Sequence, residues 1–354
     1  MPRNSFLLAA FAAASVPGLD PVKTVAIPTP ADDVDVAGVV GEDGRRVLVT
    51  CPRSTAAGVR MEKDLAISAA LSAHALSDLV PSVLGSVKLP GGGRAAVTDV
   101  FDGAPLAFDR LLEDSGLAAS LGTAIARIHE VPRHIAEGAG AEQYSPAALR
   151  ERHRAQLLRA QRSEPLPAAV LQRWQAQLAD DALWALDPVL VHGDLSDEAL
   201  FARDGRITGV RSWSSARIAD PAADLAWLAS TLETDRFDAL MAAYAAERRA
   251  PLDPRLVDRA HVLSEFAIID WLLHGIDTQD EAVIDDARAM LHELDDALAQ
   301  IAKDEAEEAY AELAAPAGPG EPGEPAVGHS ADGVAEVEAD SGSDSDPDER
   351  PASR

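Results

Sequence analysis

The stretch that decides the fold runs from Pro188 to Asp224 and reads PVLVHGDLSDEALFARDGRITGVRSWSSARIADPAAD. Its apolar run Val189–Val191 predicts a short buried strand, and the triplet His192-Gly193-Asp194 stands where that strand ends. Two further apolar runs flank the turn pair Asp204-Gly205, a pattern typical of a tight hairpin. The sequence therefore predicts that the carboxylate of Asp194 is presented on a loop, with a hairpin supporting that loop from behind.

The residues that precede this stretch predict a small antiparallel sheet. Apolar runs at 23–27, 34–40 and 46–51 are separated by turn-forming residues, and two further strands are expected at 82–89 and 95–101. A helix is expected from about Ala56 to Ala75, with buried positions at Met61, Leu65, Ile67 and Leu71.

The first 18 residues, MPRNSFLLAAFAAASVPG, allow two interpretations. An early Arg followed by apolar and small residues is the pattern of a weak signal peptide. The alternative is an Ala-rich amphipathic helix that ends at Pro17-Gly18. The helix is favoured because the basic region before the apolar run consists of a single Arg.

After a break at Asp102-Gly103-Ala104-Pro105 that resembles a hinge, the pattern becomes mostly helical. The sequence predicts an α+β protein with a sheet-rich N-lobe, residues 1–103, and a larger helical C-lobe, residues 104–314. Helices are expected at 115–131, 146–162, 166–178, 221–232, 236–249, 254–275 and 281–311.

Composition limits the classes of function. The chain has 354 residues, a net charge of −28 and a single cysteine, Cys51, so an intrachain disulfide is impossible and a cytoplasmic location is expected. Its Lys and Arg residues are scattered, which argues against nucleic-acid binding, and no apolar run is long enough to span a membrane. Residues 315–354 combine ten Asp and Glu with two Arg, so an acidic, disordered tail is expected, with an unknown partner.

Three features together resemble the aminoglycoside and macrolide phosphotransferase family. These are HGDL followed by a hairpin, the run ADPAADLAWL at 219–228, and LGTAIARIHEVP at 121–132. The resemblance covers nearly all of the first 310 residues. It implies a bilobal, protein-kinase-like fold and the transfer of a phosphoryl group from ATP, with Mg²⁺, to a hydroxyl group of a small molecule.

The resemblance also assigns site positions. Asp194 matches the catalytic base and His192 a residue that supports its loop. Val100 and Phe101 match the hinge. Asp220 and Asp224 match structural carboxylates that brace the loop and the next helix.

Three further positions depart from the family pattern. Thr50 stands where a phosphate-binding Lys is expected, opposite a helix acid that would be Asp64, with Glu62 the other candidate. Ala199 and Ser212 stand at the usual metal-ligand positions, where Asn and Asp are expected. Asp197 and Glu198 are possible substitute ligands, although charges of this kind are common in surface loops, and Arg53 is a possible substitute for the Lys.

Because metal ions and charge clamps supply most of the catalysis in phosphoryl transfer, these departures favour a pseudokinase or a very weak kinase that acts as a binding protein without a cofactor. The alternative is an active kinase that uses ATP and Mg²⁺ at an atypical metal site. The expected partner of the active kinase is a small hydroxylated molecule with antibiotic-like chemistry, and that of the pseudokinase is a small molecule or a protein.

Other polar residues of the C-lobe are weaker candidates. His129, Glu265, Asp270 and His274 could line a pocket, whereas helical periodicity favours the core for the neighbouring apolar residues Ile268, Trp271 and Leu272.

Overall fold

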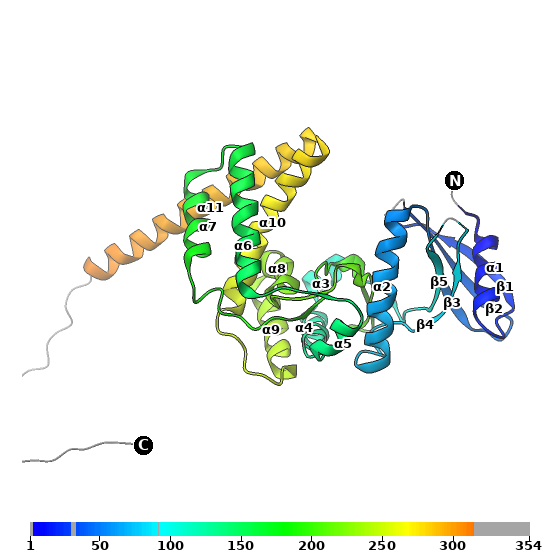
Figure 1. Ribbon diagram of the computed structural model, residues 1–354. Helices are drawn as coiled ribbons and strands as arrows, with labels where there is room; N and C mark the ends of the chain where they lie inside the picture. Colours follow the sequence, from blue (N-terminus) through cyan, green and yellow to red (C-terminus); the bar gives the residue numbers. More distant parts are fainter. Residues whose placement is uncertain (1–2, 30–32, 91, 315–354) are drawn as a thin grey trace, which may run out of the picture. The chain divides into compact units, whose positions relative to one another are not determined.

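The computed structural model describes residues 3–29, 33–90 and 92–314 (Figure 1). The chain divides into two compact units, Met1–Ala302 and Lys303–Arg354. The fold and the site described below belong to the first unit. The acidic segment 315–354, for which the sequence predicts disorder, lies outside the described residues.

The N-terminal part is an antiparallel sheet, as the apolar runs predicted, and its five strands lie in the order β1-β2-β3-β5-β4. One face of the sheet is covered by α1 (Ser5–Ser15), so the first 18 residues do contain the favoured helix. Leu8 and Ala12 of α1 pack against Ala37 and Val39, and α2 lies on the opposite side of the sheet from α1 (Figure 1). The strands are β1 (Pro21–Ile27), β2 (Val34–Gly41), β3 (Arg46–Pro52), β4 (Val83–Lys88) and β5 (Arg94–Asp99).

Helix α2 (Thr55–His74) begins where the sequence places it. The hydroxyl of Ser54 accepts the N–H of Ala57 and so satisfies one of the free donors of the first turn. Three of the four predicted core positions, Met61, Ile67 and Leu71, are buried. Leu65 is only partly buried because its side of the helix lines a cleft, so the prediction of a core position there is wrong.

The C-terminal part is mostly helical, which confirms the α+β fold class. Between its helices lie a hairpin sheet in the order β10-β9-β6 and a second small sheet in the order β7-β11-β8. The elements are β6 (Ala104–Pro105), α3 (Phe108–Glu113), α4 (Ser115–His129), α5 (Arg133–Gly138), β7 (Glu142–Gln143), α6 (Pro146–Ser163), α7 (Ala168–Ala179), β8 (Val189–Val191), η1 (Asp197–Ala199), β9 (Leu200–Arg203), β10 (Arg206–Val210), η2 (Trp213–Ser215), β11 (Arg217–Ala219), α8 (Ala222–Thr231), α9 (Thr234–Glu247), α10 (Leu256–Thr278) and α11 (Glu281–Ala314).

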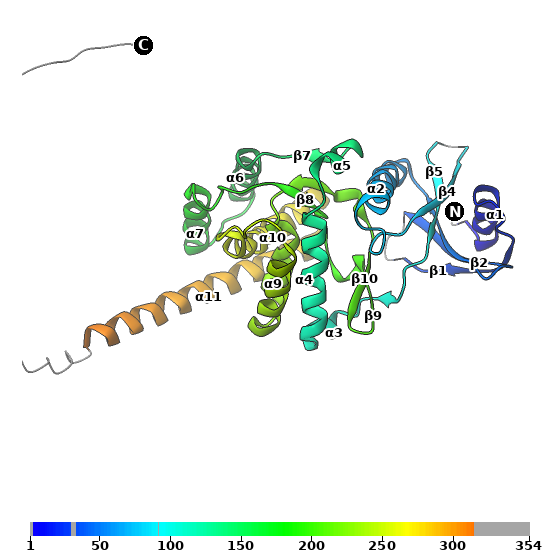
Figure 2. The ribbon, with the colours of Figure 1, turned by 90° about the horizontal axis from the view of Figure 1, so that it is seen from below.

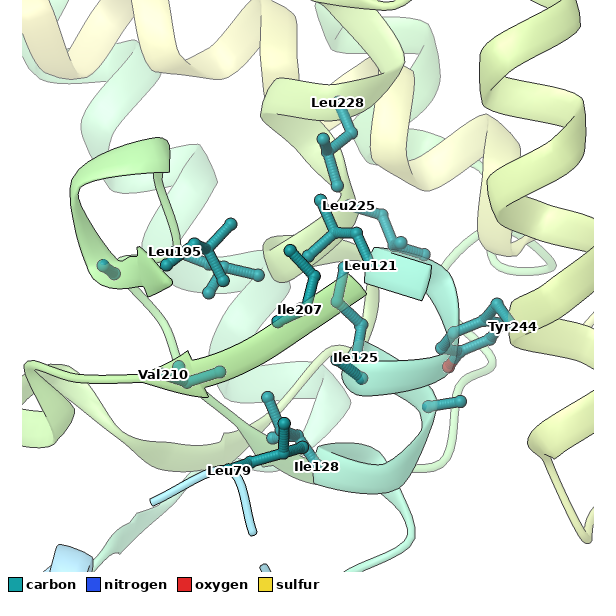
Figure 3. Packing of buried hydrophobic residues seen from close by; sticks show 14 of the residues in the cluster. Leu79, Leu121, Ile125, Ile128, Leu195, Ile207, Val210, Leu225, Leu228 and Tyr244 are labelled. Atoms are coloured by element: carbon teal, nitrogen blue, oxygen red, sulfur yellow. The ribbon is translucent and has the colours of Figure 1, made fainter. Parts of the chain in front are cut away.

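The largest buried cluster lies around α4, whose neighbours are seen from below in Figure 2. Figure 3 shows Leu195, the residue after Asp194, inside this cluster together with Leu121 and Ile207. The segment that carries Asp194 is therefore fixed to the core immediately beyond the carboxylate.

For one residue of α10, the prediction of a buried core position is wrong. Ile268 and Leu272 are buried as predicted, but Trp271 is 39% exposed. The buried stripe of α10 runs through Ile268, Ile269, Leu272 and Leu273. Trp271 precedes Leu272 by one position, so it lies about 100° from Leu272 around the helix, on the side away from Leu273. The ring of Trp271 instead stacks on His274, and its Nε1–H donates to Asp286.

Among the described residues, no helix is both long enough and apolar enough to cross a membrane.

Candidate functional site

The loop that carries Asp194 follows β8 and needs a glycine. Gly193 has φ +79°, and a Cβ at this position would overlap the guanidinium of Arg217 and the carbonyl oxygen of Ser215. Leu195 is buried, whereas the side chain of Asp194 is exposed. Within the described part of the chain, the carboxylate of Asp194 makes no hydrogen bond or ion pair. The loop thus presents a free carboxylate on a fixed backbone.

Asp224 holds this loop from below. Its carboxylate, fully buried in the first turn of α8, accepts the backbone N–H groups of His192 at 2.7 Å and Gly193 at 2.8 Å. Its Oδ2 also lies 3.2 Å from Nε2 of His129, whose Nδ1 is 2.8 Å from the hydroxyl of Tyr244. Burial acts to raise the pKa of Asp224, but these hydrogen bonds and the nearby imidazoles bring it below its ordinary value. The carboxylate therefore stays ionised under the loop.

His192 connects the loop to the segment after the hairpin. Its side chain is buried, and its Nε2 lies 2.8 Å from the carbonyl oxygen of Arg211. Because a carbonyl only accepts, Nε2 must carry the proton. The imidazole also meets the indole of Trp213 edge-on, with ring centroids 4.8 Å apart. His192 thus fixes the backbone on both sides of Ser212.

The hairpin joins the hinge to the loop. Asp204 and Gly205 both have positive φ, the geometry of the turn that matches the twist of a two-residue hairpin. Phe101 of the hinge stacks on Phe201 of β9 with centroids 4.0 Å apart. A Cβ on Gly209 would overlap the ring of Phe101, so only glycine fits there.

A cleft of about 340 Å³ lies beside this hairpin and is lined by β2, β3, β5, α2 and the segment after β10. It brings together five of the sequence-predicted site residues: Thr50, Asp64, Phe101, Glu198 and Ser212. The remaining predicted site residues are not in its lining: His192, Asp194, Asp197, Ala199 and Val100.

The helix acid has a different partner from the one that the family pattern implies. Thr50 lies on the cleft side of β3, between Val36 of β2 and Ala96 of β5 in the sheet register. The carboxylate of Asp64 accepts the backbone N–H of Trp213. Burial raises the pKa of Asp64. Asp64 therefore ties α2 to the segment that follows Ser212.

Glu62, the other candidate for the helix acid, does not face this cleft. Its carboxylate pairs with Arg94 at 2.8 Å and lines a separate hollow. Arg53 is also outside the cleft, and its Nε donates to Asp35 at 2.7 Å. The suggestion that Arg53 replaces the missing Lys is therefore wrong, because Arg53 does not line the cleft that contains Thr50 and is engaged by Asp35.

The residues at the two expected metal positions do not fit a divalent cation. Ala199 has no side-chain oxygen, and it is buried in the core cluster around α4. Ser212 offers one neutral hydroxyl, on a backbone with φ 70°. Among the described residues, no three His, Cys, Asp or Glu side chains form a group that could hold a metal ion.

The two possible substitute ligands lie on the short helix η1. Asp197 is half-buried and outside the cleft, whereas Glu198 is exposed and lines it. The carbonyl oxygen of Glu198 accepts Nε of Arg211 at 2.9 Å, and the guanidinium of Arg211 lies 6.0 Å from the ring centroid of Phe201. A cation is thus fixed beside Ser212, where the family pattern has a metal ion.

Sequence reasoning missed three features of this site: the bond from Trp213 to Asp64, the pairing of Arg60 with Asp33, and the contacts of Arg217 with the carbonyl oxygens of Gly193 and Ser215. Each of these contacts joins residues far apart in the sequence or uses backbone atoms. Contacts of these two kinds leave no recognisable pattern of residues in the sequence. The apolar wall of the cleft did leave a signal, because Val34 and Val36 alternate with buried residues along β2.

The other polar candidates of the C-lobe are separated. Asp270 and His274 line a hollow of about 430 Å³ between α6 and α10. Glu265 is instead engaged by Arg173 at 2.8 Å and by Nε1 of Trp174 at 2.9 Å, and His129 is buried beside Asp224. These four residues therefore do not form one pocket.

Comparisons with known proteins agree with the kinase-like architecture. The macrolide 2'-phosphotransferase MphH from Brachybacterium faecium is 27% identical, with a TM-score of 0.68 over 81% of this chain and 97% of that one. Aminoglycoside 2'-phosphotransferase-IIIa is 17% identical, with a TM-score of 0.64 over 83% and 99% of the two chains, and shows the fold alone.

A protein of Bacillus subtilis (strain 168), the uncharacterized protein YcbJ, is 30% identical over 106 residues. That match spans 30% of this chain and 35% of YcbJ. The model of the phosphotransferase enzyme family, APH, matches residues 33–258, which include the sheet from β2 onward, the loop of Asp194 and the cleft lining apart from Thr29. The chain belongs to the phosphotransferase enzyme family.

Proposed function

We propose that this protein is a pseudokinase of the phosphotransferase family, which binds a small hydroxylated molecule and transfers phosphoryl groups very slowly or not at all. The observation that carries the proposal is the hydrogen bond between Asp64 and Trp213 beside Thr50 in the cleft. Thr50 stands where the resemblance predicts the phosphate-binding Lys, and Asp64, the acid that the resemblance assigns to orient such a Lys, accepts the N–H of Trp213. A triphosphate would find neither the Lys nor the metal ligands that neutralise its charge.

The binding partner is expected to resemble the acceptors of related enzymes rather than a macromolecule. Solved structures of the same fold include macrolide and aminoglycoside phosphotransferases, one of them with bound kanamycin. The free carboxylate of Asp194 could accept a hydrogen bond from a hydroxyl of such a molecule. Cys51 is a buried free thiol, which agrees with the proposed cytoplasmic location.

The proposal is tested by calorimetric titration with ATP and Mg²⁺ or Mn²⁺, followed by measurement of ADP release with a panel of macrolides and aminoglycosides. Weak or absent nucleotide binding and no acceptor-dependent ADP release are expected. Micromolar affinity for Mg·ATP, or turnover above the uncatalysed background, would contradict the pseudokinase.

Glu198 favours the second candidate, an active kinase with an atypical metal site, because its side chain lines the cleft. In that case Asp194→Asn should abolish turnover, since Asp194 would orient the acceptor hydroxyl. Glu198→Gln should weaken the dependence of turnover on Mg²⁺, with Glu233→Gln as a control on an exposed carboxylate at the start of α9. Full activity of Asp194→Asn would exclude the assigned base.

A further inference from the structure

Arg217 of β11 lies directly beside the loop that carries Asp194. Its Nη1 donates to the carbonyl oxygen of Gly193 at 3.2 Å and to that of Ser215 at 3.0 Å. In the parallel register of β7 and β11, Arg217 is the partner of Glu142. The guanidinium is therefore held next to the residue that precedes Asp194, and its strand runs beside the carboxylate of β7.

Two further cations reach the carboxylate of Glu142 from other elements. Lys63 belongs to α2, which packs against α5, and α5 in turn packs against β11 (Figure 2). Arg152 belongs to the second turn of α6, the helix that follows β7. The hydrogen bond from Tyr144 lowers the pKa of Glu142, and the charges of these two cations and of Arg217 add to that effect. The three cations therefore surround one carboxylate close to the loop.

The hydrogen-bond donors of these cations are largely unused. Among the described residues, the side chains of Lys63 and Arg152 make no hydrogen bond and no ion pair. The guanidinium of Arg217 uses Nη1 alone, again within the described part of the chain. A guanidinium presents five N–H donors in a fixed fork, and an ammonium presents three. Most of these donors remain available to a bound group, and a carboxylate or a phosphate matches them best.

The carboxylates of this neighbourhood are engaged by neutral donors instead. Glu142 accepts the hydroxyl of Tyr144. Asp270, which lines the hollow between α6 and α10 together with Arg152, accepts the side-chain amide of Gln156. Carboxylates are abundant in a chain of net charge −28, yet none in the described ranges pairs with Arg152. Arg152 thus faces the hollow with its donors free.

We propose that these three cations, Lys63, Arg152 and Arg217, bind an anionic group, a carboxylate or a phosphate ester, of the small molecule whose hydroxyl meets Asp194. The inference rests on the proposed function, because it concerns the ligand of the same loop. It goes further by giving the charge of that ligand. A polycationic compound such as an aminoglycoside would place like charges beside the three cations and is disfavoured.

The experiment is a calorimetric titration of the full-length protein with four sugars that differ only at the sixth carbon: glucose, glucuronate, glucose 6-phosphate and 6-amino-6-deoxyglucose. At least one anionic sugar is expected to bind about tenfold more tightly than glucose, and the amino sugar more weakly than glucose. The two anionic sugars distinguish a carboxylate ligand from a phosphate ester. Equal affinities throughout, tighter binding of the amino sugar, or no binding of either anionic sugar would overturn the inference.

A matched pair of double variants locates the effect. Lys63→Gln with Arg152→Gln removes two of the cations without removing any ion pair of the described residues, so the protein should stay folded. Its affinity for the preferred anionic sugar should fall about tenfold, to the level of glucose. Lys23→Gln with Arg162→Gln removes the same charges from β1 and from the last turn of α6, and should keep the preference. Equal losses in the two double variants would reduce the effect to net charge and overturn the assignment.

The ligand series and the transfer assay fail separately. Acceptor-dependent ADP release would refute the pseudokinase whatever the charge of the preferred ligand. Tighter binding of the amino sugar without any ADP release would leave the pseudokinase standing and refute the anionic ligand.

Discussion

At the scale of single residues, His153 shows how burial changes a titratable side chain. Its imidazole lies between the rings of Trp184 and Phe266, with centroids 5.5 Å and 5.1 Å away, and its Nδ1 is buried without a hydrogen-bond partner among the described residues. Burial, with a smaller contribution from the charge of Arg152, lowers the pKa of His153 to about 4. The folded protein therefore keeps this imidazole neutral.

This shift predicts a specific loss of stability in acid. Between about pH 6.5 and pH 4 the unfolded chain binds a proton at His153 that the folded chain refuses, so the free energy of unfolding should fall as the pH falls through this window, by about 3 kcal/mol. Above pH 6.5 the residue contributes no pH dependence. Urea unfolding at pH 7.5 and pH 4.5 measures the loss, which should be smaller in His153→Phe. The exposed His134→Phe is the control, and an equal loss in both variants would refute the assignment.

At the scale of secondary-structure elements, the sequence predicted most of the fold but few of the contacts. Strong periodicity identified α4 and α6 to within a few residues, and the Asp204-Gly205 pair identified the hairpin. Strands β7 and β11 were missed because each spans only two or three residues and forms through pairing with distant segments. The resemblance to the phosphotransferase family assigned Thr50 and Asp64 to the site, and both line the cleft. The bond between Asp64 and Trp213 joins distant segments and could not be predicted.

Helix α1 is expected to stabilise the sheet through one side only. Leu8 is 1% exposed against the sheet, while its neighbour Leu7 is 43% exposed. Leu8→Ala should lower the free energy of unfolding by about 2–4 kcal/mol, because it leaves a cavity in the cluster that covers the sheet. Leu7→Ala, the matched control, should change it by less than about 0.5 kcal/mol. Chemical denaturation followed by circular dichroism measures both, and similar values for the two variants would mean that α1 does not pack as described.

At the scale of the whole molecule, the acidic segment 315–354 should contribute little to the stability of the folded part. Its composition contains too little apolar surface to offset the entropy cost of ordering the chain. The three buried clusters of the described residues draw on residues from Leu8 to Leu298. A chain that ends at Ala314 retains all of them, so its melting temperature should lie within about 2 °C of that of the full chain.

A deeper truncation provides the contrast that makes this prediction specific. Ending the chain at Asp280 removes α11, and with it the buried side chains of Ile284, Ala287 and Leu291, which pack in the cluster that also contains Leu272. Losing three buried apolar side chains should cost several kcal/mol and lower the melting temperature by about 10 °C or more. Differential scanning calorimetry distinguishes the two truncations. A large drop on removing residues 315–354 alone would show that the acidic segment packs on the folded part, against the expectation from its composition.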